Sequence, residues 1–255
     1  MSMARAGPAA DLPAEPAPGL LAGLPDGLPD AEVLERELRA NGHAVTPPFL
    51  SPAGCAALRD LFDDPARFRK TVDMGRHAYG SGLYRYFGYP LPDTVARLRA
   101  AFYARLAPVA SRMAADLRAP REYPPDLEGY LAACHAAGQR QATPLMLRYG
   151  PGDYNRLHQD LYGAIRFPLQ VVIGLHAPGR DYEGGEFLLL ENRPRQQSIG
   201  AAVAIPQGAA VIFPVAERPA PGARGFVKAA MRHGVSRVRA GERLTLGLIF
   251  HDATK

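Results

Sequence analysis

Two residues near the middle of the chain, His158 and Asp160, are separated by a single position at the end of RYGPGDYNRLHQD. Side chains two positions apart on an extended segment point to the same side, so the imidazole and the carboxylate can reach one metal ion. An isolated pair of this kind is also common as a hydrogen-bonded surface pair. A second histidine, His233, follows far downstream on another predicted strand. Two imidazoles and one carboxylate leave three positions open on a metal, the arrangement associated with non-haem Fe(II) oxygenases.

The elements that must bring these residues together are short strands. After about residue 143, β-rich segments separated by Gly and Pro cover 144–149, 169–176, 185–190, 203–206, 209–214, 234–238 and 243–251. Seven or more short strands predict a sandwich or barrel. Inward-facing residues from strands that are distant in sequence can converge at one end of such a barrel.

The first 142 residues differ in character from the rest. Residues 1–30 are dominated by Ala, Pro and Gly and predict a disordered tail. Residues 31–142 predict a helix-rich supporting region, in which Asp30 and Ser51 are expected N-caps. Residues 143–255 are expected to form the catalytic core. The predicted fold class is therefore α+β, with a helical N-terminal layer on an antiparallel double sheet.

Two local features of the supporting region carry specific expectations. The apolar spacing from Val95 to Leu117 predicts a long helix, which Pro108 should kink or split. The segment HAYGSGLYRYFGYP, residues 77–90, is dense in Gly and Tyr without periodicity and predicts a loop.

The composition limits the classes of protein to which the chain can belong. The chain has 255 residues, of which 47% are hydrophobic and 22% charged, as in an ordinary globular protein. Polar residues or Pro interrupt every apolar run before the ~20 residues that a membrane-spanning helix needs, so no membrane association is expected. Pro and Asp near the N-terminus also interrupt the apolar stretch that a secretory signal needs. The two cysteines, Cys55 and Cys134, are too few for a disulfide framework. We therefore expect a cytoplasmic protein.

Positive charge is concentrated late in the chain. The formal net charge is +5, and residues 191–243 hold nine Arg or Lys against three Glu. This basic segment predicts a surface for nucleic acid or another polyanion, with a solvated arginine-rich face as the alternative.

The motifs together resemble the Fe(II)/2-oxoglutarate-dependent dioxygenases, whose pattern is His-x-Asp, a distal His and then a basic residue. The resemblance covers residues 143–252 and implies a double-stranded β-helix, or jelly-roll, barrel. It implies Fe(II), 2-oxoglutarate and O₂ as cofactor and co-substrates, with His158, Asp160 and His233 as the iron ligands. The pieces stand in the family's order: RYGPGDYNRLHQD, LQVVIGLHAP, YEGGEFLLLEN, QGAAVIFP and RHGVSRVRAGERLTLGLIFHDA.

The same resemblance implies a binding site for the co-substrate. Arg243 would hold the C5 carboxylate of 2-oxoglutarate, Thr245 would support it, and Tyr149 matches a tyrosine that often touches this molecule. A planar guanidinium suits a carboxylate through two parallel hydrogen bonds, and Arg243 and Thr245 share one strand face. Glu186 of the GGEF segment is expected to be structural, and Gln159 should face away from the metal or toward substrate.

Two resemblances give different substrates. The segment from Arg148 to Asp160 looks like the ligand segment of AlkB-type nucleic-acid dealkylases, whereas YEGGEF and RHGVSRVRAGER look more like prolyl hydroxylases. The combination also resembles bacterial proteins grouped as predicted nucleic-acid-modifying oxygenases. We therefore expect oxidative demethylation of alkylated bases, and Tyr84, Arg85, Tyr86 and Tyr89 are candidates for stacking a flipped base.

Two alternative functions stay open. One is a protein side-chain hydroxylase of the prolyl type, which has the same iron chemistry. The other is a non-catalytic sensor of metal or 2-oxoglutarate, against which the intact set of ligands argues. A methylated oligonucleotide that increases succinate formation and releases formaldehyde separates demethylation from both.

Overall fold

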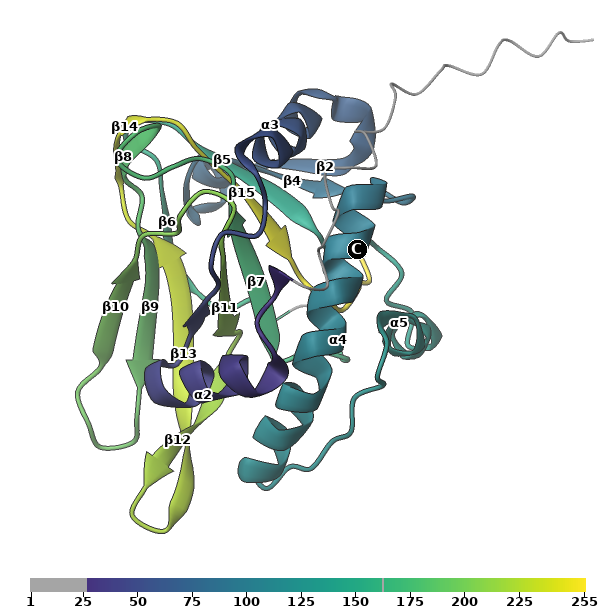
Figure 1. The fold of residues 1–255 in the computed structure, drawn as a ribbon, viewed down its shortest axis with the longest axis vertical. Coiled ribbons are helices and arrows are strands. Elements are labelled where there is room, and N and C mark those ends of the chain that lie inside the picture. The colour runs from purple at the N-terminus through teal and green to yellow at the C-terminus, as the bar shows by residue number, and fades with distance from the viewer. Residues whose placement is uncertain (1–26, 162) are drawn as a thin grey trace, which may run out of the picture.

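Two antiparallel sheets face each other, and helices cover the outer side of one of them (Figure 1). This computed structural model describes residues 27–161 and 163–255. The tail expected over residues 1–30 therefore lies, up to residue 26, outside the described residues. In the described part of the chain, no helix is long and apolar enough to cross a membrane.

The larger sheet has seven strands in the order β1-β11-β7-β15-β5-β4-β2, and the smaller has six, β10-β9-β13-β6-β3 with β12 beside β13. We call them the major and minor sheets. The strands are β1 (Ala44–Val45), β2 (Phe68–Asp73), β3 (Gly80–Ser81), β4 (Leu83–Phe87), β5 (Leu145–Tyr149), β6 (Tyr154–His158), β7 (Leu169–Gly174), β8 (Tyr182–Gly184), β9 (Phe187–Asn192), β10 (Ile199–Val203), β11 (Ala210–Pro214), β12 (Glu217–Gly222), β13 (Gly225–Val235), β14 (Val238–Gly241) and β15 (Arg243–Leu248). Strands β8 and β14 form a separate pair.

The helices all precede β5. They are α2 (Ala31–Asn41), α3 (Pro52–Asp60), α4 (Asp93–Asp116) and α5 (Leu127–Ala136), with single 3-10 turns η2 (Leu61–Asp63), η3 (Pro65–Arg67) and η4 (Met74–His77). Asp30 and Ser51 precede α2 and α3 as N-caps, and the Ser51 hydroxyl accepts a hydrogen bond from the Gly54 amide at 3.1 Å. Both cap predictions therefore agree with the structure, although the Asp30 side chain makes no capping hydrogen bond.

Apolar and polar side chains alternate along the central strands, so the major sheet has one apolar face and one polar face. On β15, Leu244, Leu246 and Leu248 join the core formed with α4, whereas Arg243 and Thr245 line a pocket between the sheets. This is the period of two expected for a strand. Neighbouring strands repeat the division, so the core lies between the helices and the sheet, and the polar residues face the inside of the double sheet.

Two expectations about the first half of the chain differ from the structure. Residues 77–90 are not only a loop, because they contain β3 and β4, which pair with β6 and β5. The strands are short and interrupted by Gly82, so the segment has too few alternating positions to show a period. The region before residue 143 also contributes β1, β2 and β4 to the major sheet, beside its helices.

The second concerns Pro108, where a kink or a split was expected, and α4 is not split. The helix is continuous from Asp93 to Asp116 and lies along the major sheet (Figure 1). Residues before and after the proline, including Phe102 and Met113, pack into the same core. Burial of this single apolar face therefore holds both halves of the helix together despite the lost backbone donor.

A buried ion pair joins α4 to the end of the chain. Arg99 and Asp252 are 1% and 0% exposed, and their side chains meet at 2.9 Å. The guanidinium also donates to the carbonyl oxygens of Ile249 and Phe250, at 2.9 and 3.0 Å. The Asp252 carboxylate accepts further hydrogen bonds from the hydroxyl of Tyr89 and contacts His135 at 2.8 Å. This network fixes the segment that follows β15 against the helix.

We expect Asp252→Ala to lower the free energy of unfolding by about 3–5 kcal/mol, because the change leaves the charge of Arg99 buried without its partner. Urea unfolding followed by circular dichroism measures this loss. Asp63→Ala is the control. Asp63 also pairs with an arginine, Arg148 at 3.6 Å, but its side chain is 80% exposed, so its loss should change stability by less than about 1 kcal/mol. Equal effects of the two substitutions would contradict the prediction.

Candidate active site

His158 is the last residue of β6 and is held by the backbone on either side of it. The preceding turn is closed by Asp153, whose carboxylate accepts from the Gly150 amide at 2.9 Å. Gly152 in this turn has a φ of +91°, which favours glycine. The His158 Nδ1 lies 2.7 Å from the carbonyl oxygen of Arg156, so it is the nitrogen that donates. Its Nε2 is thereby left to face the pocket as a possible metal ligand.

His233 lies directly across from His158, because the two residues are register partners on β13 and β6. Its imidazole is 6% exposed and packs beside the rings of Phe213 and Phe187, whose centroids are 4.7 and 6.0 Å away. Burial lowers the pKa of His233, which favours the neutral form that binds metals. Gly234 permits the close approach of the strands, because a Cβ there would lie 2.7 Å from the Asn155 carbonyl oxygen.

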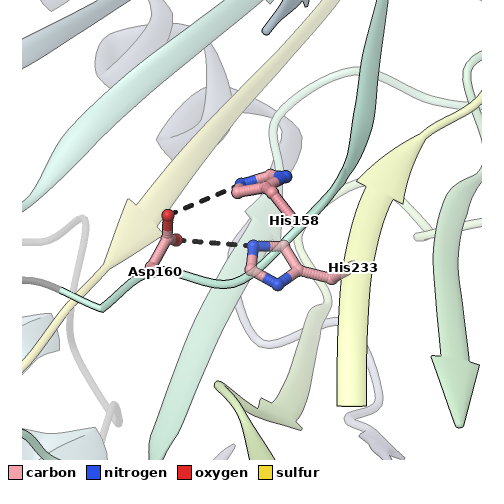
Figure 2. A group of neighbouring side chains, drawn as sticks. All are labelled: His158, Asp160 and His233. Carbon is pink, nitrogen blue, oxygen red and sulfur yellow. Dashed lines mark ion pairs between the residues drawn. The ribbon is translucent and has the colours of Figure 1, made fainter. Parts of the chain in front are cut away.

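Asp160 completes the group, and its carboxylate faces both imidazoles, with one oxygen directed at each (Figure 2). Oδ1 is 3.5 Å from the Nε2 of His158, and Oδ2 is 3.4 Å from the Nε2 of His233. Burial favours a higher pKa for Asp160, but hydrogen bonding and positive charge from both histidines outweigh it and hold that pKa well below its usual range. Burial lowers the pKa of His158, and the contacts with Asp160 outweigh this effect and raise it.

The three side chains fit a single metal ion. One ligand atom from each can be chosen so that all lie within 4.8 Å of one another. Atoms that bind one ion at ~2.1 Å and at right angles are themselves about 3 Å apart, so only small side-chain movements would bring these three onto a common ion. The two histidines approach from strands of the minor sheet and Asp160 from the segment that follows β6, which leaves the side facing the major sheet open to other ligands.

A buried cation lies across the pocket from the three ligands. Arg243 is 1% exposed, and its Nε and Nη2 atoms make no hydrogen bond. The Thr245 hydroxyl, two residues later on the same face, is also buried and without a partner. The guanidinium lies 5.4 Å from the ring centroid of Tyr149, its register partner on β5. Because buried polar groups are normally paired, these free donors indicate a binding site for an anion.

The GGEF segment shapes this part of the pocket. Gly185 has a φ of +62°, and a Cβ there would come within 2.9 Å of the Arg243 side chain. Glu186 accepts a hydrogen bond from the hydroxyl of Ser236. The segment therefore makes room for Arg243 and connects the start of β9 to the end of β13, consistent with the structural role expected for Glu186.

Gln159 lies between His158, the last residue of β6, and Asp160, and its side chain is held by two hydrogen bonds. Its amide donates to the carbonyl oxygens of Ala216 and Met231 at 2.9 and 2.7 Å. These bonds attach the segment between His158 and Asp160 to β13. The sequence shows that this residue lies between two ligands, but the two carbonyl groups come from distant segments that only the fold brings near.

The pocket that contains all these side chains has a volume of about 620 Å³. Tyr84 and Tyr86 line it, and alternation on β4 turns Arg85 to the other face, where it contacts Phe62. The Tyr89 hydroxyl is bonded to Asp252. Of the four residues expected to stack a base, the structure therefore places only the two tyrosines of β4 in the pocket.

The basic residues of segment 191–243 do not all lie on the surface. Arg218 is 3% exposed and paired with Glu191 at 2.5 Å, and Arg243 lies inside the pocket. Arg193 also bonds Glu191, and Lys228 is paired with Glu217 at 2.9 Å. Several of the charges therefore stabilise the fold, which sequence alone could not distinguish from a surface for a polyanion.

Comparison with known proteins gives a family and a fold. A family model described as an oxygenase "catalysing oxidative methylation of damaged DNA" matches residues 82–253. An uncharacterized protein of Mycobacterium tuberculosis is 51% identical over 167 residues, which span 66% of this chain and 72% of the relative.

Solved structures share the fold at low sequence identity. A Pseudomonas putida prolyl-4-hydroxylase has a TM-score of 0.51 and 14% identity, with 88% of this chain and 100% of that chain covered. A 2OG-Fe(II) oxygenase from Burkholderia pseudomallei has a TM-score of 0.51 and 18% identity, with 89% and 94% covered. The α-ketoglutarate-dependent epimerase SnoN has a TM-score of 0.52 and 15% identity, with 85% and 80% covered. The double sheet is thus the fold of these enzymes.

Proposed function

The chain belongs to the oxygenase family whose model matches residues 82–253, within the Fe(II)/2-oxoglutarate-dependent superfamily, and we propose that it removes N-alkyl groups from damaged bases in nucleic acid. As a member of this superfamily it is an enzyme that uses Fe(II), 2-oxoglutarate and O₂. The observation that carries the substrate is the family's description, which names damaged DNA.

His158, Asp160 and His233 are the residues that we assign to the iron. The observations behind this assignment are their common position within 4.8 Å and the donor set of two imidazoles and one carboxylate. When bound, the iron couples the decarboxylation of 2-oxoglutarate to succinate with the use of O₂ to hydroxylate a C–H bond. The protein supplies a neutral His233, an ionised Asp160 and a His158 oriented by its Nδ1 contact.

Arg243 and Thr245 are assigned to the co-substrate. The free Nε and Nη2 of the guanidinium and the free hydroxyl are the groups that a carboxylate would satisfy. Tyr149 packs beside the guanidinium, and burial raises the pKa of this tyrosine to about 12, so it stays a neutral donor. These contacts would orient 2-oxoglutarate and keep water from its far carboxylate.

The remaining part of the pocket is where the base would bind. Tyr84 and Tyr86 provide aromatic surface, and Leu145, Leu147 and Ile249 provide apolar surface beside them. Hydroxylation of an N-methyl group gives N–CH₂OH, which breaks its C–N bond to leave N–H and formaldehyde. A base must leave the helical stack to enter such a pocket.

The test has two stages. Anaerobic titration with Fe(II) and 2-oxoglutarate should produce the visible charge-transfer band of a chelated keto acid. Addition of O₂ with oligonucleotides carrying N-methylated bases should then release formaldehyde in proportion to succinate. Succinate formation stimulated by a proline-containing peptide instead, with no formaldehyde from any oligonucleotide, would replace base demethylation by protein hydroxylation.

A further inference from the structure

Gln170 on β7 is a buried polar residue that the assignments above do not use. It is 4% exposed, and its amide Nε2 makes no hydrogen bond. Buried side-chain donors are normally paired, and an unpaired one destabilises the folded protein. The side chain lines the same pocket as the proposed metal ligands. An unpaired amide at this place indicates that a bound molecule supplies its partner.

The direction of the side chain follows from alternation on β7. Leu169, Val171 and Ile173 belong to the core between the major sheet and the helices. Gln170 and Val172 therefore point to the other face, where Val172 packs against Phe213 and its neighbours. The amide thus projects into the space between the two sheets rather than toward α4.

Gln170 lies close to the proposed metal site. Its register partner on β11 is Phe213, whose ring centroid is 4.7 Å from that of His233. One cross-strand neighbour therefore separates the amide from a proposed metal ligand. A molecule held by the amide would be adjacent to the position where oxidation occurs.

Gln170 is nevertheless distant from Arg243 along the major sheet. Strand β7 pairs with β15 so that Gly174 faces Thr245 and Val171 faces Leu248. Val171, the residue next to Gln170, therefore lies five residues from Arg243 along β15, or roughly 17 Å at the rise of a strand. The carboxylate of 2-oxoglutarate assigned to Arg243 therefore lies away from the amide, which favours the substrate as the partner of the amide.

The neighbouring surface favours a flat ring. Tyr86, Leu145 and Ile249 form one apolar cluster with Tyr84 and Leu147, and these side chains line the same pocket as Gln170. A planar molecule that packs on this cluster would present its edge to the amide. Amide side chains pair with the edges of nucleobases through a donor and an acceptor.

We propose that Gln170 recognises the hydrogen-bonding edge of the base to be dealkylated, which makes it a specificity-determining residue. This inference rests on the function proposed above. It assigns different ends of one pocket to two ligands: Arg243 to the carboxylate of the co-substrate and Gln170 to the base.

The test uses Gln170→Met, which keeps the length of the side chain and removes both polar atoms, with Gln197→Met at an exposed position as the matched control. Oligonucleotides with N-methylated adenine, cytosine, guanine or thymine are the substrates. We expect kcat/KM for the preferred oligonucleotide to fall about 10- to 100-fold in Gln170→Met. The KM for 2-oxoglutarate and succinate formation without oligonucleotide should stay within about twofold of wild type.

Thermal unfolding is a second measurement, which separates a binding role of Gln170 from a structural role. Removal of an unpaired buried amide should leave Tm unchanged or raise it, whereas loss of a structural hydrogen bond would lower it. A lower Tm with equal losses for every substrate and co-substrate would therefore overturn the inference.

The remaining outcomes distinguish this inference from the proposed function. Unchanged kcat/KM in Gln170→Met, with wild-type protein active on an oligonucleotide, would overturn the role of Gln170 and leave base demethylation standing. Failure of wild-type protein to release formaldehyde from any of the four would overturn both.

Discussion

Replacing Asp160 with asparagine should lower both Fe(II) affinity and 2-oxoglutarate turnover by more than about 100-fold, beyond the 10–100-fold typical of groups that only orient ligands. The substitution keeps the shape of the side chain and removes its charge. The carboxylate is the only anionic ligand assigned to the site, and its oxygens lie 3.5 and 3.4 Å from the Nε2 atoms of His158 and His233. Iron content after anaerobic reconstitution and succinate formation measure the two losses.

His158→Ala should give a similar loss with little effect on the fold, which makes it the better histidine variant. His158 is at the end of β6, its side chain is 36% exposed, and its backbone contact is with Arg156. His233 is packed between aromatic rings, so its removal would also leave a cavity in the core. His43→Ala, outside the pocket, is the control. Full iron binding by both Asp160→Asn and His158→Ala would refute the assignment of this metal site.

The metal-site prediction could be made from sequence because it depends on local spacing. His158 and Asp160 are two positions apart, as are Arg243 and Thr245, and strand geometry alone puts each pair on one side. The order of the motifs then indicated which distant histidine completes the group. The structure brings His233 directly opposite His158, as that expectation requires.

Other features depend on strand partners that no local pattern reveals. Strand β6 was not predicted, because YNRLH lacks alternation and faces partly toward the pocket. The role of Gln159 depends on the carbonyl oxygens of Ala216 and Met231, which are brought near by β12 and β13. Likewise, Gln170 reads as one polar residue in an apolar strand, and only its missing partner and its distance from Arg243 suggest a role.

The role of each charge in the basic segment could not be predicted for a related reason. Arg218 is paired with Glu191, 27 residues earlier in sequence, and both are buried. A count of charges along the chain treats each arginine as a solvent-exposed group. Which of them stabilise the fold depends on their carboxylate partners across the minor sheet.

Replacing Arg243 with methionine should raise the KM for 2-oxoglutarate about 10- to 100-fold while Fe(II) binding without co-substrate stays unchanged. The range follows from the loss of charge-assisted hydrogen bonds worth about 1.5–3 kcal/mol. Arg243→Lys should recover only part of the affinity, because an ammonium group cannot make two parallel bonds to a carboxylate. Succinate formation at varied 2-oxoglutarate, without added oligonucleotide, provides the measurement.

Stability measurements on the same variant separate a binding role from a structural one. In wild-type protein the guanidinium is buried with two nitrogens unpaired, so 2-oxoglutarate should raise Tm by satisfying them as well as by mass action. Arg243→Met removes the unpaired charge, so without ligand its Tm should equal or exceed that of wild type, and 2-oxoglutarate should no longer raise it. Arg237→Met is a suitable comparison, because Arg237 contacts the Gly152 carbonyl and the Tyr154 ring outside the pocket. A larger rise in KM for Arg237→Met than for Arg243→Met would move the carboxylate site to the exposed arginine.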